Sequence, residues 1–260
     1  MNEDMEKGLP ETQSPLSDGY QADPPLKPGE DGFLGRLIDL VVKPGRLMVH
    51  VEAVPRWWQA GLLLFLLMAA FSWLIMPVSG PEQMELMRDS KLGQLMPPGE
   101  WEKAYAEALD PDPTKRILQS LGAGLSTWVM VLVLSFVLGF FARMSGGQGS
   151  FKQALGVVHW ASLIPFGMVV IIKAPLILMT ESLMQVNIGL AALLPDADPG
   201  SVLFQILVTY GDFFNWWGLA ILVIGFRQVF RMSSGAAAVS VLLPWALLVA
   251  IPVGINLAMM

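Results

Sequence analysis

The sequence of 260 residues has no cysteine, only two histidines and few charged residues. Without cysteine there is no disulfide framework, no thiolate zinc site and no cysteine nucleophile. His50 and His159 alone are too few for a conventional zinc site. Charged residues make up 15% of the chain and hydrophobic residues 54%, whereas about 25% charged residues is usual for a soluble domain. The formal net charge of −6 argues against nucleic-acid binding.

Sequence motifs of common enzymes are also absent. The chain has no G-x-x-x-x-G-K-[ST] phosphate loop, no H-E-x-x-H zinc motif and no G-x-S-x-G nucleophile elbow. Among the acidic residues only Asp212 falls in an apolar block, so the paired aspartates of an intramembrane protease are missing. We therefore expect no enzymatic activity, no catalytic residue, no cofactor and no bound metal.

The apolar residues are gathered in long blocks instead of being spread in the pattern of a soluble core. A membrane-spanning helix needs about 20 mostly apolar residues. Five blocks qualify, at about 57–78, 117–142, 154–179, 212–230 and 236–258. The predicted fold class is all-α: a polytopic membrane protein with a bundle of five transmembrane helices over residues 57–258 and a disordered cytoplasmic N-terminal tail.

The distribution of basic residues predicts the orientation of the spans. Lysine and arginine are enriched in cytoplasmic loops, and here they precede span one and fill the loops between spans two and three and between spans four and five: Arg36, Lys43, Arg46, Arg56, Arg143, Lys152, Arg227 and Arg231. The loop at 79–116 has eight acidic and five basic residues, and the loop at 180–201 has no basic residue. We expect a cell (inner) membrane protein with its N-terminus in the cytoplasm and its C-terminus outside.

Two segments precede the first span. Residues 1–31 contain eight acidic residues, two lysines and five prolines, a composition that is typical of disorder because too little apolar surface is available for a core. Residues 32–56 form an amphipathic lead-in. Its first part, Phe33–Val42, has apolar residues at helical spacing, with Arg36 and Asp39 on the other side. This pattern predicts a short helix at the cytoplasmic membrane surface.

Two further segments lie between the spans. Within the outer loop at 79–116, Trp101, Tyr105 and Leu109 repeat every four residues, which predicts an amphipathic helix over Glu100–Leu109. That helix is expected either to cap the bundle or to form a partner surface. Residues 201–210 are apolar enough to extend span four, while Gly211 favours a break and an interfacial or re-entrant piece.

Ionisable residues inside the spans are costly and mark candidate sites. Lys173 and Asp212 are expected at similar depth in the outer part of the bilayer, and a Lys173–Asp212 ion pair is the leading predicted contact. Such a pair either fixes helix packing or lines a polar route. His159, near the cytoplasmic side of span three, is expected to form a hydrogen bond with a neighbouring helix. Pro165 and Pro175 predict a kink in the same span.

Asp212 is followed by Phe214 two residues later, by Trp217 five residues later and by Gly225 further along the span. This pattern of Asp, Phe, Trp and Gly resembles that of the Yip-one (Ypt-interacting protein) domain family. The resemblance extends over roughly residues 35–258.

The resemblance implies five spans, a cytoplasmic N-terminal tail and a very short C-terminal end. Eukaryotic relatives bind small GTPases of the Rab type and shape vesicle traffic, and some bacterial relatives act beside ABC-type exporters. The short loops of this chain favour a bacterial-type member. The expected partners are therefore the lipid bilayer and other integral membrane proteins, with an ABC-type exporter and a second copy of the chain among the alternatives.

Two hypotheses for the function follow. The first is a non-enzymatic scaffold or assembly factor that works through lateral helix contacts. The second is a small permease or channel with a polar route through Lys173, Asp212 and Asn215. The residues expected to form the structural or partner-binding site are Lys173, Asp212, Phe214, Asn215, Trp217 and Gly225.

Overall fold

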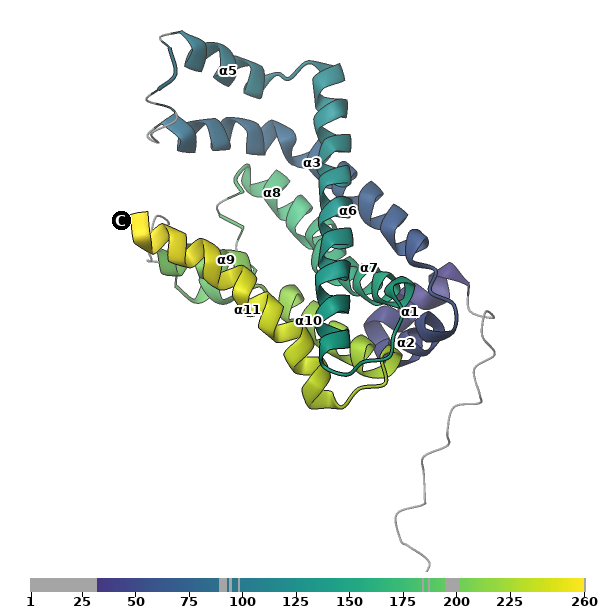
Figure 1. The fold of residues 1–260 in the computed structure, drawn as a ribbon. Coiled ribbons are helices and arrows are strands. Elements are labelled where there is room, and N and C mark those ends of the chain that lie inside the picture. The colour runs from purple at the N-terminus through teal and green to yellow at the C-terminus, as the bar shows by residue number, and fades with distance from the viewer. Residues whose placement is uncertain are drawn as a thin grey trace, which may run out of the picture.

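The computed structural model describes residues 32–88, 93, 95–97, 99–183, 185–186, 188–194 and 202–259. The tail predicted at 1–31 lies outside the described residues. Within the described part of the chain the regular elements are helices, and the only extended pairing there is an isolated bridge between Gly189 and Asp212 (Figure 1).

Two short helices, α1 (Phe33–Val42) and α2 (Pro44–Ala53), lead into the first span. The bounds of α1 are those predicted from the apolar spacing. Pro44 occupies the first turn of α2, where its missing N–H costs nothing. Leu47 and Met48 of α2 are fully buried in the main core, so α2 anchors this lead-in to the transmembrane bundle.

The polar side of α1 faces the protein. Arg36 and Asp39 are only 2% and 7% exposed, whereas Leu34 and Ile38 are 73% and 63% exposed. Asp39 forms an ion pair with Arg46 of α2, with Oδ2 and Nε 3.3 Å apart. An outward apolar side is what a helix at a membrane surface requires, and the position of α1 at that surface stays a prediction.

Three helical segments are long and apolar enough to cross a membrane, and two shorter apolar helices follow them. They are α3 (Trp57–Arg88), α6 (Pro113–Met144), the composite α7 (Phe151–Met168), η1 (Val169–Lys173) and α8 (Ala174–Thr180), then α10 (Phe213–Val229) and α11 (Ser234–Met259). At about 1.5 Å per residue, the 17 residues of α10 reach about 26 Å, within the range of short spans. The chain is an all-α polytopic membrane protein, as predicted.

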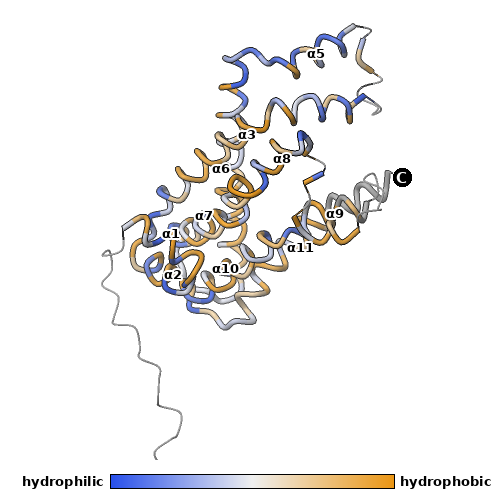
Figure 2. Tube along the Cα trace, turned by 180° about the vertical axis from the view of Figure 1, so that it is seen from behind, coloured by the Kyte–Doolittle hydropathy of each residue, from blue (hydrophilic) through white to orange (hydrophobic). Residues whose placement is uncertain are grey.

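The C-terminal end of α3 and the N-terminal end of α6 extend past the predicted spans and form a helical hairpin with α5 (Glu100–Leu109) (Figure 1). The helix predicted over Glu100–Leu109 is present with these bounds. Figure 2 shows that this hairpin is more hydrophilic than the spans below it. Tyr105 donates a hydrogen bond to Glu85 of α3 at 3.1 Å, and the Trp101 ring stacks on Tyr105 at 5.0 Å. These contacts fix α5 against the end of α3.

The first turn of α6 depends on one carboxylate, and this dependence predicts a response to pH. Asp112 accepts hydrogen bonds from the backbone N–H groups of Lys115 and Thr114, which lower its pKa below the ordinary value of 3.8. Because the folded-state pKa is the lower one, the cap is fully present above pH 3.8 and is lost as the pH falls through the lowered pKa.

We expect hydrogen exchange of the amides at the start of α6, corrected for intrinsic rates, to stay slow from pH 7 to 5. Exchange should accelerate only below about pH 3.8. The Asp112→Asn variant keeps an N-capping oxygen without a titrating group, so its protection should not depend on pH. Equal pH dependence in the two proteins would show that this cap does not control the turn.

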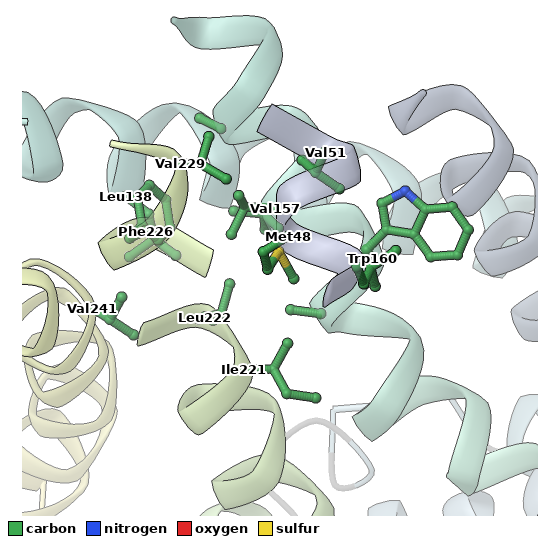
Figure 3. Packing of buried hydrophobic residues seen from close by; sticks show 14 of the residues in the cluster. Met48, Val51, Leu138, Val157, Trp160, Ile221, Leu222, Phe226, Val229 and Val241 are labelled. Carbon is green, nitrogen blue, oxygen red and sulfur yellow. The ribbon is translucent and has the colours of Figure 1, made fainter. Parts of the chain in front are cut away.

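The main core lies where α2, α6, α7, α10 and α11 converge (Figure 3). Met48, Val157 and Phe226 meet there and are fully buried. Glycines allow the helices to approach closely. A Cβ at Gly124 of α6 would lie 2.6 Å from the backbone oxygen of Phe65 in α3. This contact leaves no room for a side chain where α3 and α6 cross.

The fourth predicted span is divided from the apolar segment before it. Helix α9 (Val202–Tyr210) ends before Gly211, and α10 begins at Phe213. Helix α9 packs against α11 and against the 3₁₀-helix η2 (Leu190–Leu193), so it does not continue α10 as one long helix (Figure 1). Of the two alternatives, the structure contains the break at Gly211.

Candidate functional site

The third span changes its winding just before Pro175. The α-helix gives way to a π-helical turn, Val169–Lys173, and resumes as α8 with Pro175 in its first turn. Proline has no N–H to donate and its ring crowds the carbonyl of the preceding turn, which accounts for the wider turn here. π-helical turns are frequent at functional sites. Lys173 is the last residue of this one.

Asp212 is the N-cap of α10. Its backbone is extended, and its Oδ1 accepts a hydrogen bond from the backbone N–H of Phe214 at 2.8 Å. An aspartate here satisfies one of the free N–H groups at the helix start and places a negative charge at the positive end of the helix dipole. The backbone N–H of Asn215 donates to the Asp212 carbonyl at 3.1 Å.

Two glycines hold the segment before α9 against this helix start. The Leu190 N–H donates to the Gly211 carbonyl at 3.1 Å, and Gly189 pairs with Asp212 in the isolated bridge. A Cβ at Gly189 would lie 2.5 Å from the Gly211 oxygen. The approach of the two backbones therefore requires glycine at this position.

The predicted ion pair is present. Lys173 Nζ lies 2.6 Å from Asp212 Oδ2, and the Asp212 side chain is 7% exposed while that of Lys173 is 21% exposed. The pair joins the third span to the start of the fourth. Burial strengthens the attraction between the two charges and also raises the cost of separating them. Lys173 and Asp212 thus form a joint between two spans.

The space beside this ion pair is small. A cavity of about 20 Å³ lies between Lys173, Gly189 and neighbouring apolar side chains of the loop and of α9. A single water needs at least about 10–15 Å³. The cavity therefore has room for one water molecule next to the lysine.

Aromatic side chains surround the start of α10. Phe214 and Trp217 are half-buried and pack against the main core, while Phe213 contacts the Trp217 ring edge-on at 5.7 Å. The ring of Trp216 lies 5.2 Å from that of Trp245 of α11. Phe214 and Trp217 thus attach the start of α10 to the main core, and Trp216 links α10 to α11.

Gly225 lies elsewhere. It is 13 positions after Asp212 on α10, about 20 Å along the helix. A Cβ there would lie 2.5 Å from Val157 Cγ1 and 2.9 Å from Met48 Sδ. Gly225 therefore permits the close packing of α10 on α7 and α2, in the core region that Figure 3 shows. The structure joins Lys173, Asp212 and the nearby aromatic residues in one site and places Gly225 in a second contact.

A family model described as the Yip1 domain matches residues 38–255, from α1 to α11. The chain belongs to the Yip1 domain family. No match was found among curated proteins or among solved structures. The matched residues include both the joint at Asp212 and the hairpin of α3, α5 and α6.

The Yip1 domain also contains a polar network at its predicted cytoplasmic end that the sequence did not indicate. Glu52 of α2 forms an ion pair with Arg231 at 3.0 Å and accepts a hydrogen bond from Gln228 at 3.1 Å. Its backbone carbonyl accepts from Gln153 Nε2 of α7 at 3.0 Å. Glu52, Gln153 and Arg231 line an open cavity of about 530 Å³. The network ties α2 to α7 and to the end of α10.

The prediction for His159 was wrong. Its Nδ1 lies 2.8 Å from the carbonyl of Leu155, one turn earlier in the same helix, and not against a polar group of a neighbouring helix. The ring is fully buried and lies 5.5 Å from the Trp57 ring of α3. In an apolar span the nearest acceptor is a backbone carbonyl of the same helix. Hydropathy alone does not distinguish this acceptor from a polar group on a neighbouring helix.

Proposed function

We propose that this Yip1-domain protein is a non-enzymatic membrane scaffold or assembly factor that acts through lateral contacts with other integral membrane proteins. The observation that carries the proposal is the state of Asp212. One carboxylate oxygen accepts from the Phe214 N–H and the other pairs with Lys173. Because both oxygens of this buried carboxylate already have partners within the protein, a structural role is favoured over ligand binding.

The alternative is a small permease or channel that uses Lys173, Asp212 and Asn215. The π-helical turn at Lys173 favours it, because such turns often accompany functional sites. Against it, the cavity beside the pair measures only about 20 Å³, enough for one water and not for a continuous polar path. This comparison supports the scaffold.

We also propose in which membrane the protein lies, how it is oriented and which partners it has. A cell (inner) membrane location with the N-terminus in the cytoplasm is supported by the basic residues around Glu52 and Arg231 and by the acidic outer loop. Family resemblance points to a trafficking role or to a bacterial-type role beside an ABC-type exporter. The hairpin of α3, α5 and α6 provides a hydrophilic surface for such partners outside the bilayer (Figure 2).

The proposal is tested by purifying the tagged full chain in a gentle detergent and quantifying co-purifying proteins by mass spectrometry. A scaffold is expected to retain an integral membrane partner in a fixed ratio. A second aliquot is reconstituted in liposomes and assayed for ion and small-solute flux, which should match that of empty liposomes. A monodisperse protein without a partner that conducts solute would support the permease instead.

A further inference from the structure

The first span contains a break in its backbone hydrogen bonds. Pro77 and Pro81 lie inside α3, and a proline within a helix has no N–H to donate to the carbonyl four residues earlier. For Pro77 that carbonyl belongs to Trp73. Prolines at such positions are a common cause of helix bends, and in Figure 2 the outer part of α3 is turned relative to its first part. The Trp73 carbonyl therefore lacks its usual partner within α3.

The depth of this carbonyl in the membrane makes an unpaired state costly. Trp73 is 16 positions after Trp57, the first residue of α3, and therefore about 24 Å further along the span. The hydrocarbon core of a bilayer is about 30 Å thick, so the carbonyl lies towards the far side of the membrane. Backbone groups at that depth must be paired by protein groups because water is scarce there. A donor from outside α3 is therefore required.

Arg116 of α6 provides that donor. Its Nη2 donates a hydrogen bond to the Trp73 carbonyl at 2.6 Å, and its Cζ lies 4.2 Å from the centre of the Trp73 ring. A charged donor forms a stronger hydrogen bond than a neutral one, and a planar guanidinium also stacks on aromatic rings. One side chain of the second span thus contacts both the carbonyl that Pro77 leaves unpaired and the ring of the same residue.

Helix α5 is attached to the part of α3 that follows Pro77. A Cβ at Gly80 would lie 3.1 Å from the carbonyl oxygen of Ala108 in α5, so the two helices approach closely just past the break. Further along, Tyr105 of α5 donates its hydrogen bond to Glu85 of α3. A change in the bend of α3 at Pro77 therefore moves α5 together with the outer part of α3.

We propose that Arg116 is a positioning residue that clamps a hinge of α3 at Pro77 and thereby sets the orientation of the hairpin of α3, α5 and α6 relative to the transmembrane bundle. This inference goes beyond the proposed function and does not depend on it, because the orientation is a property of the chain alone. The alternative is that Arg116 only places its charge at the membrane surface beside an aromatic ring. That role would not depend on the proline.

The test uses the absence of cysteine from the chain. Ala106→Cys on α5 and Met130→Cys on α6 replace exposed side chains, and they place one spin label on the hairpin and one on the bundle of the full chain. Double electron–electron resonance in nanodiscs then measures the distance between the labels, which should have a single narrow distribution. We expect Arg116→Met, which removes every donor of the side chain, to lose this narrow distribution because α3 then bends freely at Pro77.

The deciding variant is Pro77→Ala, which returns an N–H to the Trp73 carbonyl. In that background, adding Arg116→Met should leave the distance distribution unchanged, because the carbonyl then has its partner within α3. The matched control is Lys103→Met, which removes an equal charge from an exposed position of α5 and should leave the wild-type distribution narrow. A narrow distribution with Arg116→Met, equal broadening with and without Pro77, or equal broadening with Lys103→Met would overturn the proposal.

Hydrogen exchange provides a second measurement, on the chain without labels. We expect the backbone amides around Pro77 to exchange at least about tenfold faster in Arg116→Met, the effect of losing one hydrogen bond from a charged donor. Pro77→Ala should abolish this increase. If Arg116→Met does not fold, recovery of the folded protein by adding Pro77→Ala supports the clamp. Failure to fold in both backgrounds would contradict the clamp, because Arg116 would then be needed for a reason unrelated to the proline.

Discussion

The Asp212→Ala variant is expected to lose up to about 3–5 kcal/mol of unfolding free energy, because it leaves the half-buried Lys173 without its counter-charge. The loss of the N-cap of α10 adds about 1 kcal/mol. The measurement is equilibrium unfolding in mixed micelles of a mild detergent and SDS. Asp212→Asn keeps a capping oxygen and removes only the charge, so the difference between the two variants isolates the cap.

A double variant separates the joint from the charges that form it. Lys173→Met combined with Asp212→Asn has no unpaired charge, and Asn retains the bond from the Phe214 N–H. We expect the double variant to be more stable than either single variant, by at least about 2 kcal/mol. Additive losses in the double variant would show that the two side chains do not stabilise each other. Reversal of the pair is a poorer test, because lysine at position 212 cannot cap α10.

Gly124→Ala is expected to disrupt the crossing of α3 and α6, the pair of helices with the most extensive contact in the described structure. The new methyl group would lie 2.6 Å from the backbone oxygen of Phe65, which cannot move without shifting α3. The expected loss is at the upper end of about 1–3 kcal/mol for overpacking. The same mixed-micelle titration provides the measurement.

Gly122→Ala is the internal control for this substitution. Gly122 lies two residues earlier on α6, and a Cβ there meets no atom within 4 Å. Alanine also has the higher helix propensity, so the stability of this variant should be unchanged or slightly raised. A loss as large as that of Gly124→Ala would indicate a general sensitivity of α6 and not a specific contact with Phe65.

Periodicity and hydropathy predicted most of the helices. The bounds of Phe33–Val42 and Glu100–Leu109 followed from apolar residues at helical spacing, and the ion pair of Lys173 with Asp212 followed from their matched depth in adjacent spans. These features depend on local pattern or on the cost of an unpaired charge in lipid. The local pattern and the unpaired charges can both be recognised in a single sequence.

Contacts between segments without a pattern were not predictable in the same way. The approach of Gly189 to Gly211 depends on the path of an irregular loop, and the inward position of Arg36 depends on how α1 docks. The central role of Glu52 arises because α2, α7 and the end of α10 meet around it. Each of these depends on tertiary packing, which a single sequence does not reveal.

In the proposed scaffold, Asp212 acts as a joint between two spans and not as a group that binds a solute. The most direct test of this role is the amount of membrane partner recovered, per mole of tagged full chain, with the Lys173→Met and Asp212→Asn double variant. We expect the double variant to recover as much partner as the wild type, and Asp212→Ala to recover severalfold less. A double variant that is as stable as the wild type but recovers no partner would contradict it, because the charges themselves would then be required.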